Sequence, residues 1–381
     1  MKPVERVEAV MRGEKPDRVP VMHISYSSKI ASHILGREAY VGGGIQQYRE
    51  AVALWNGPDA HAEYLTRCEE DAVAIAQACG HDCIRPYYWR MNVKPAARVD
   101  ELTFRYEHED GSWEVRRFDP PTELYSVVEQ SPREEVKLED IGRIVEHAER
   151  DAEEYKPSEA RFADVLRVIE AFGDEYAVRS GGPWTCIPYE DPGWLEAIVL
   201  APDLVGRHLD TQVTTSLKNI DFLVKRGVKM LFGGGDMAYD LGPIYSPRTF
   251  HELMVPRLRK ISDRCNELGV WHLFGTDGNL WPIADDFYGA SGIHGHYEVD
   301  RKARMDIRRI HERFPHIALF GNVSSYTLHV GTVDDVIAET RACMEEAKET
   351  GKVVAGSSNM LVPETPMANV EAMLKTVDEY R

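Results

Sequence analysis

Short apolar runs alternate with longer stretches of helical spacing along the second half of the chain. One run is Met230-Leu-Phe-Gly-Gly-Gly-Asp236, and the next is Val270-Trp-His-Leu-Phe-Gly-Thr-Asp277. Between them, apolar side chains recur at the spacing of an amphipathic helix, at Phe250, Leu253, Met254, Leu258, Ile261 and Cys265. This pattern predicts two parallel strands joined by a crossover helix.

The same alternation extends over the whole chain. Predicted strands begin near residues 19, 83, 176, 230, 270, 293, 317 and 352, and helical sequence follows each of them. Eight such units predict one α/β domain over residues 1–381, folded as a (β/α)8 barrel, or TIM barrel. The runner-up is an open doubly wound sheet, but no G-x-G-x-x-G motif follows any of these strands.

The first half is less regular. Residues 27–82 are mostly helical in pattern, and the second predicted strand covers residues 83–88. The runs at residues 104–108 and 113–118 flank Glu109-Asp110-Gly111, which is typical of a β-hairpin. We therefore expect extra N-terminal helices and an insertion over about residues 88–175 that carries the hairpin.

Composition excludes several classes of partner. The net charge of −18 argues against nucleic acid, which requires clustered Lys and Arg. No apolar run approaches the roughly 18 residues of a membrane span, and the N-terminus is too charged for a secretory signal. The six cysteines include no C-x-x-C pair, as expected of reduced thiols. We expect a cytoplasmic protein with a small-molecule substrate and no nucleic-acid or membrane partner.

Two aspartates are the first candidates for catalysis. Asp236 and Asp277 each follow a predicted parallel strand, and the C-terminal ends of such strands converge on one mouth. Carboxylates there can orient a substrate hydroxyl, act as acid and base, or hold an oxygen-ligated cation. The alternative is a helix N-cap, a common role for Asp after a strand.

Histidines are the second group of candidates. His296 lies near the end of the sixth strand, and His23 lies at the end of the first; either could donate a proton near neutral pH. His294 should face the same way as His296, because the two are separated by one residue on a strand. His272 lies inside the fifth strand, where packing is the more common role. The predicted substrate-binding residues follow the same strands: Glu298, Asn279, Asn322, Asn359, Tyr26 and Trp281.

Several short motifs carry a family resemblance through their order and spacing. They are Gly233-Gly-Gly-Asp236, Leu241-Gly-Pro-Ile-Tyr-Ser-Pro247, Asp277-Gly-Asn279, Tyr297-Glu298, Leu319-Phe-Gly-Asn322, Gly331-Thr-Val-Asp-Asp335 and Gly356-Ser-Ser-Asn359. Together they resemble the uroporphyrinogen decarboxylase superfamily, which also contains cobalamin-dependent methyltransferases. The resemblance implies a (β/α)8 barrel, in agreement with the strand pattern.

The resemblance also indicates a branch. The true decarboxylase carries an arginine-rich segment after the first strand, whereas this chain has His23-Ile-Ser-Tyr-Ser-Ser-Lys29. The zinc methyltransferases carry H-x-C-G after one strand and Cys after the last. The corresponding positions here are Gly275, Asp277 and Ser357 or Ser358. We therefore expect no thiolate-bound zinc and assign no metal ligands, while a cation held by Asp, His or Glu side chains stays open.

The leading hypothesis is a methyltransferase that moves a methyl group from a small methylated compound to a corrinoid (cobalamin). Without thiolate-bound zinc, a donor whose methyl group is bonded to oxygen fits better than a thiol that accepts a methyl group, because a thiol needs a soft metal for its activation. The corrinoid would be carried by a partner protein, since the chain shows no cobalamin-binding domain of its own. One alternative is a decarboxylase or lyase of a small acid, with Arg85, Arg179 or Lys29 as the clamp. Another is a non-catalytic ligand-binding barrel. The substrate and the oligomeric state, for which a homodimer is one candidate, stay open.

Overall fold

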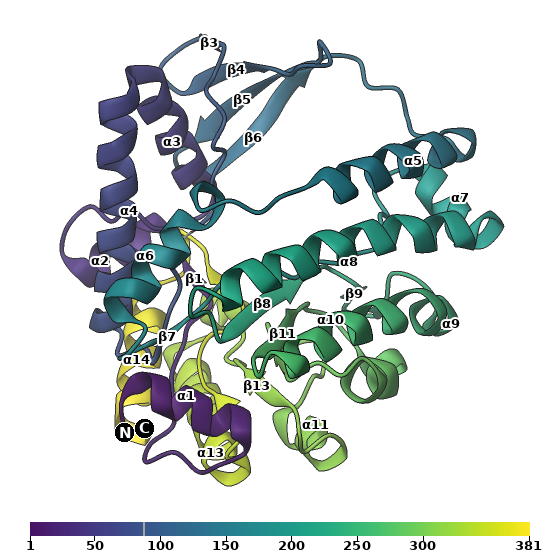
Figure 1. Cartoon of the computed structure of the whole chain (residues 1–381). Coiled ribbons are helices and arrows are strands. Elements are labelled where there is room, and N and C mark those ends of the chain that lie inside the picture. Colours follow the sequence, from purple (N-terminus) through teal and green to yellow (C-terminus); the bar gives the residue numbers. More distant parts are fainter. Residues whose placement is uncertain (87) are drawn as a thin grey trace.

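A parallel sheet of five strands forms the centre of the C-terminal half (Figure 1). The computed structural model describes residues 1–86 and 88–381. Tyr87, which the predicted second strand includes, lies outside the described residues. The sheet has the order β14-β13-β12-β11-β8. Its strands are β8 (Met230–Gly234), β11 (Trp271–Gly275), β12 (Gly295–Tyr297), β13 (Ala318–Phe320) and β14 (Val353–Val354).

Two further parallel pairs continue this arrangement at its edges. They are β1 (Ser25–Tyr26) with β15 (Met360–Leu361), and β2 (Cys83–Ile84) with β7 (Ala177–Val178). Isolated bridges join Val21 to Ala355 and Ser180 to Leu231, and the Asp82 N–H donates to the Val21 carbonyl at 2.8 Å. The predicted mixed α/β class is confirmed. The described strands form separate sheets and not one closed ladder, so the closed barrel stays a prediction.

Helices follow the parallel strands along the chain and pack outside them. They are α1 (Pro3–Arg12), α2 (Ser28–Leu35), α3 (Gly44–Asn56), α4 (Pro58–Ala78), α5 (Leu138–Glu154), α6 (Ala163–Phe172), α7 (Pro192–Leu200), α8 (Pro202–Val224), α9 (Pro247–Thr249), α10 (Val255–Glu267), α11 (Ile307–Arg313), α12 (Ser325–Val330), α13 (Val333–Thr350) and α14 (Met367–Tyr380). The start of α13 shows why the sequence begins a helix there. The Thr332 hydroxyl accepts from the Asp335 N–H at 3.2 Å, and the Asp335 carboxylate accepts from the Thr332 N–H at 2.9 Å.

The predicted hairpin is part of a larger antiparallel sheet, which lies with α3 away from the parallel strands (Figure 1). Its strands, in spatial order, are β3 (Ala97–Arg98), β4 (Thr103–Glu107), β5 (Trp113–Asp119) and β6 (Leu124–Gln130). A short hairpin, β9 (Ala238–Tyr239) with β10 (Gly242–Pro243), follows β8. None of the helices in the described part of the chain combines the length and apolar character that crossing a membrane requires.

Alternation along the strands separates two apolar layers. Tyr297 belongs to the inner layer with Phe232 and Phe320, whereas Phe274 belongs to the outer layer under the helices. Because successive side chains on a strand face opposite sides, His296 faces the outer layer. This choice of face decides which polar groups reach the mouth.

Candidate active site

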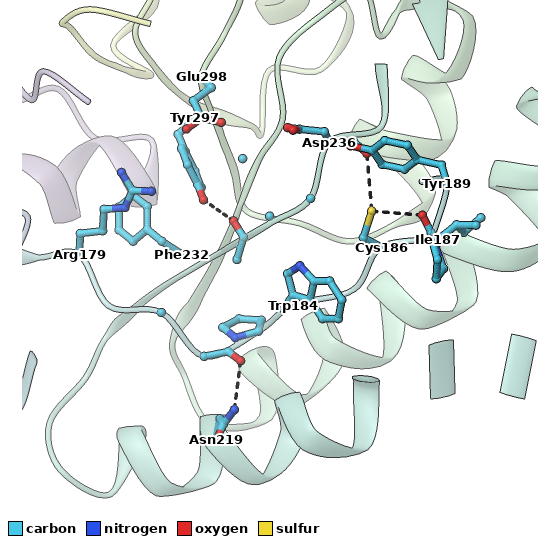
Figure 2. A pocket seen from close by; sticks show the side chains of 18 of the residues that line it. Arg179, Trp184, Cys186, Ile187, Tyr189, Asn219, Phe232, Asp236, Tyr297 and Glu298 are labelled. Atoms are coloured by element: carbon cyan, nitrogen blue, oxygen red, sulfur yellow. Dashed lines mark hydrogen bonds between the residues drawn. The ribbon is translucent and has the colours of Figure 1, made fainter. Parts of the chain in front are cut away.

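A cavity of about 750 Å³ lies beyond the C-terminal ends of β7, β8 and β12 (Figure 2). Arg179, Asp236 and Glu298 each contribute to its wall, and Trp184 and Tyr189 add aromatic surface. Figure 2 shows Asp236 and Glu298 on the same side of this space. The expectation that polar side chains after successive strands meet at one mouth agrees with this placement.

Gly233 and Gly235 let the segment after β7 approach the end of β8 closely. A Cβ on Gly233 would lie 2.6 Å from the Pro183 carbonyl oxygen, and one on Gly235 would lie 2.9 Å from the Cys186 Cβ. Larger residues would therefore push apart the two segments that form this side of the cavity. The backbone approach requires glycine.

Glu298 is the acidic group whose environment is most altered at this mouth. It has a positive φ of 70°, an uncommon conformation for a residue other than glycine. Burial raises the pKa of its carboxyl to about 7; Arg179 and Arg85 lower it, while Asp277 and Asp236 raise it further. Glu298 is therefore partly protonated at neutral pH and can act as a proton donor.

Asp277 lies next to Glu298 in a second, smaller cavity of about 180 Å³ that Glu298 also lines. The Asn359 side-chain amide donates to the Asp277 carboxylate at 3.1 Å. Burial raises the Asp277 pKa, and the charges of Asp236 and Asp300 raise it as well. The structure thus brings together Asp236, Asp277, Glu298 and Asn359 of the predicted site.

His23 is buried below this region and is neutral. Its Nδ1 accepts from the Ser357 N–H at 3.1 Å, and burial lowers its pKa to about 4. The Tyr26 hydroxyl lies 3.1 Å from the Nε2 of His81, a neighbour that sequence reasoning did not single out. Neither His23 nor Tyr26 is in the walls of the two cavities, as far as the described residues show.

His296 lies outside the group of carboxylates. Its ring is fully buried in the outer layer, where Nδ1 is 2.8 Å from the Tyr288 hydroxyl and Nε2 is 2.8 Å from the Thr276 carbonyl oxygen. Burial lowers its pKa to about 4. His294 shares this side of the strand, and its Nδ1 accepts from the His272 N–H at 2.9 Å.

Three of the predicted substrate-binding side chains form hydrogen bonds with the backbone of neighbouring segments: Asn279, Trp281 and Asn322. The Asn279 side-chain oxygen accepts from the Trp281 N–H at 3.1 Å, and the Trp281 indole donates to the Arg304 carbonyl at 2.8 Å. The Asn322 amide donates to the Met305 carbonyl at 3.2 Å. Within the described residues, none of the three lines either cavity. Their hydrogen bonds fix loops around the mouth.

Tyr297 is a site residue that sequence reasoning did not assign. Its hydroxyl donates to the Gly233 carbonyl at 2.5 Å, and the Arg179 guanidinium lies 4.7 Å from its ring centroid (Figure 2). Glu298 is the next residue, so the packing of the Tyr297 ring also fixes the position of the Glu298 backbone, from which its carboxyl extends. The available signal was strand alternation, which places Tyr297 and His296 on opposite faces.

The residues at the zinc-ligand positions of the resembling methyltransferases do not fit a thiolate zinc site. A Cβ on Gly275 would lie 2.1 Å from the Tyr297 ring, so the tyrosine occupies the space of a side chain there. Asp277 is held by Asn359, and the Ser357 hydroxyl accepts from the Ile24 N–H at 3.3 Å. In the described part of the chain, no three His, Cys, Asp or Glu side chains are grouped to hold a metal ion.

The chain matches a protein-family model and two curated relatives. The family model described as Uroporphyrinogen decarboxylase (URO-D) matches residues 129–380. Methylcobamide:CoM methyltransferase MtaA of Methanosarcina barkeri (strain Fusaro / DSM 804) is 28% identical over 180 residues, which are 47% of this chain and 50% of that protein. A second MtaA, from Methanosarcina barkeri, is 27% identical over 180 residues with the same coverage. The chain thus spans about half the length of the curated relatives it matches.

A solved structure matches the chain as a whole. The methyltransferase from Methanosarcina mazei has a TM-score of 0.64 and 22% sequence identity. The match covers 100% of this chain and 99% of that one. It shows that the two share a fold.

Proposed function

The chain belongs to the uroporphyrinogen decarboxylase family, and from that premise we propose that it is a corrinoid-dependent methyltransferase. It moves a methyl group from a small compound with an oxygen-linked methyl to a corrinoid carried by a separate protein. The names of the two relatives support methyl transfer that involves a corrinoid. In this proposal the eight parallel segments form a (β/α)8 barrel, and the substrate enters at its C-terminal mouth.

Glu298 carries the proposal. Breaking the bond between the methyl carbon and oxygen leaves an electron pair on that oxygen, which then needs a proton. The corrinoid supplies the electron pair that takes up the methyl group. Glu298 lines the large cavity with a pKa raised to about 7, so its carboxyl can supply the proton at neutral pH.

Asp236 and Asp277 position the substrate in this proposal. Asp236 is exposed at the rim of the large cavity, and Asp277 is partly buried and held by the Asn359 amide. Both carboxylates can accept hydrogen bonds from a substrate hydroxyl. Their negative charge also raises the pKa of Glu298, which keeps the donor protonated. No step is assigned to zinc, because the residues present do not fit it.

A direct assay tests this function. The purified protein is incubated with cob(I)alamin and a panel of methyl ethers, and methylcobalamin is followed by its visible spectrum. We expect at least one ether to methylate the corrinoid, and Asp277→Asn to abolish that transfer. No methylation by any ether, together with carbon dioxide release from a small acid, would overturn the proposal.

Arg179 favours one second candidate, decarboxylation of a small acid. Its side chain lines the large cavity near Glu298, where a guanidinium can bind a substrate carboxylate. Carbon dioxide release in the same assay distinguishes this activity from methyl transfer. Arg179→Lys should weaken acid binding if decarboxylation is the activity, since lysine loses the two-pronged geometry.

A further inference from the structure

The large cavity beside Glu298 has a wall rich in aromatic side chains. Phe232 and Tyr297 pack against each other, with ring centroids 5.3 Å apart, and the Trp194 ring packs against His208 at 4.6 Å. Two other rings of the wall contact no aromatic side chain among the described residues. Within that part of the chain, the aromatic residues of the wall are Phe162, Trp184, Tyr189, Trp194, Phe232 and Tyr297, and the two without a ring contact are Trp184 and Tyr189.

Trp184 is exposed although its backbone is firmly held. Its side chain is 52% exposed, whereas tryptophan is on average a highly buried residue. The Trp184 N–H donates to the Ser216 hydroxyl at 2.9 Å, and that hydroxyl donates to the Trp184 carbonyl at 3.0 Å. The indole is therefore presented at the cavity by a fixed segment (Figure 2). A ligand ring stacked on it would bury apolar surface that the fold leaves in water.

The size of the cavity agrees with a ligand that carries a ring. Its volume is about 750 Å³, which lies within the range of roughly 300 to 1,000 Å³ for pockets that enclose most of an organic ligand. One water molecule occupies roughly 30 Å³ in the liquid. An ether of only a few heavy atoms would therefore fill a small part of this space and touch few of the aromatic side chains.

The strength of Glu298 as an acid gives an independent indication of the leaving group. A phenol such as the tyrosine side chain has an ordinary pKa of about 10, whereas water, which resembles simple alcohols in acidity, has a pKa of about 15.7. The less basic oxygen of a phenol takes the electron pair of the broken bond more readily and needs less help from a proton donor. A donor with a pKa of about 7 therefore suits an aryl ether better than an alkyl ether.

Resting on the proposed function, we propose that the large cavity binds an aromatic ring and that the methylated substrate is an aryl methyl ether. The ring lies against Trp184 and Tyr189, and the ether oxygen faces Glu298. The bond between the methyl carbon and this oxygen breaks as the carbon bonds to the electron pair of the corrinoid. The oxygen keeps the electron pair of the broken bond and takes the proton of Glu298, so the second product is a phenol. The Glu298 carboxylate regains its proton from water.

A matched pair of ligands tests ring binding without any turnover. The ligands 2-methoxyphenol and 2-methoxycyclohexanol carry the same substituents, but only the first has an aromatic ring. Binding of each to the purified full chain, with no corrinoid present, is measured by isothermal titration calorimetry. We expect saturable binding of 2-methoxyphenol and about tenfold weaker binding of the saturated ligand. Equal affinities, or no binding of 2-methoxyphenol, would overturn the proposal.

Trp184→Leu tests the location, because leucine keeps an apolar side chain and removes the ring. Affinity for 2-methoxyphenol should fall by about three- to tenfold, while affinity for 2-methoxycyclohexanol should change by less than about twofold. The matched control is Trp55→Leu on α3, where the indole is 38% exposed and lies 6.3 Å from the Phe104 ring; both affinities should stay unchanged. Equal losses for the two ligands in Trp184→Leu, or no loss at all, would overturn the proposal. Tyr189→Leu repeats the test on the second ring if Trp184→Leu does not fold.

Turnover with cob(I)alamin separates this inference from the proposed function. If 2-methoxyphenol binds as expected but no ether methylates cobalamin, the proposed function fails while the aromatic binding site stands. If alkyl methyl ethers methylate cobalamin and aryl methyl ethers neither bind nor react, the inference fails while the methyltransferase stands.

Discussion

Burial shifts side-chain pKa values in opposite directions in two regions that β12 connects. Beyond the end of the strand, burial raises the pKa of Glu298 to about 7. On the outer face of the same strand, burial lowers the pKa of His296 to about 4. Because burial disfavours the charged form of either group, the carboxyl keeps its proton near neutral pH and the imidazole loses it. At this mouth the group suited to donate a proton is therefore a carboxyl.

The largest effect that this contrast predicts is a loss of catalytic turnover in the Glu298→Gln variant. Glutamine keeps the size of the side chain but cannot donate a proton to the leaving oxygen. The turnover number for methyl transfer should fall by about 10² to 10⁴-fold, measured from methylcobalamin formation. Asp263→Asn, on the surface of α10, is the control and should match the wild type. Wild-type turnover in Glu298→Gln would remove this residue from proton transfer.

His296→Leu should affect stability and leave turnover of the folded protein nearly unchanged. The substitution removes the hydrogen bonds to the Tyr288 hydroxyl and the Thr276 carbonyl, which leaves two buried polar groups unpaired. We expect the free energy of unfolding to fall by about 2 to 4 kcal/mol, measured by urea denaturation. A large loss of turnover at unchanged stability would place His296 in the reaction and reverse the contrast.

Gly275→Ala probes how Tyr297 holds the mouth in place. The added methyl group would lie 2.1 Å from the Tyr297 ring, so the ring and the adjoining Glu298 must move. We expect a loss of about 1 to 3 kcal/mol in stability, measured by urea denaturation, and a lower turnover. Gly289→Ala has open space around the new methyl group and serves as the control. Equal stability of the two variants would show that Tyr297 does not fill this space.

The smallest expected effects are two opposite slopes of stability with pH. Glu298 has a folded pKa above its ordinary value, so its contribution to stability is full below about pH 4.5 and is lost as pH rises through about 7. His296 has a folded pKa below its ordinary value, so its contribution is full above about pH 6.5 and is lost as pH falls through about 4.

Urea denaturation across this pH range measures both slopes. Relative to the wild type, Glu298→Gln should lose stability less as pH rises, and His296→Leu should lose it less as pH falls. Parallel curves for the wild type and both variants would contradict the assigned protonation states.

The sequence predicted the mixed α/β class and the positions of the parallel segments because apolar runs and helical spacing are local properties. It also placed Asp236, Asp277, Glu298 and Asn359 after strands, and the rule that such positions converge is topological. The insertion was predicted as a hairpin, but β3 and β6 are short or largely exposed strands with weak apolar alternation.

Other features of the site depend on tertiary packing. Which face of β12 turns inward depends on Tyr297 filling the space above Gly275, and a shift of one residue would exchange His296 and Tyr297. The raised pKa of Glu298 depends on burial by segments far away in the sequence. The position of Ser358 depends on the loop after β13, where the Val323 carbonyl accepts from its N–H at 2.7 Å. None of these contacts has a local sequence pattern.

The most direct test of the central claim is the pH dependence of turnover in methylcobalamin formation, for the wild type and Glu298→Gln. If Glu298 is the proton donor, wild-type turnover falls as pH rises through about 7, and the variant shows a low rate without that fall. A wild-type profile that is flat across pH 6 to 8, or the same fall in both proteins, would contradict the assignment of Glu298 as the donor.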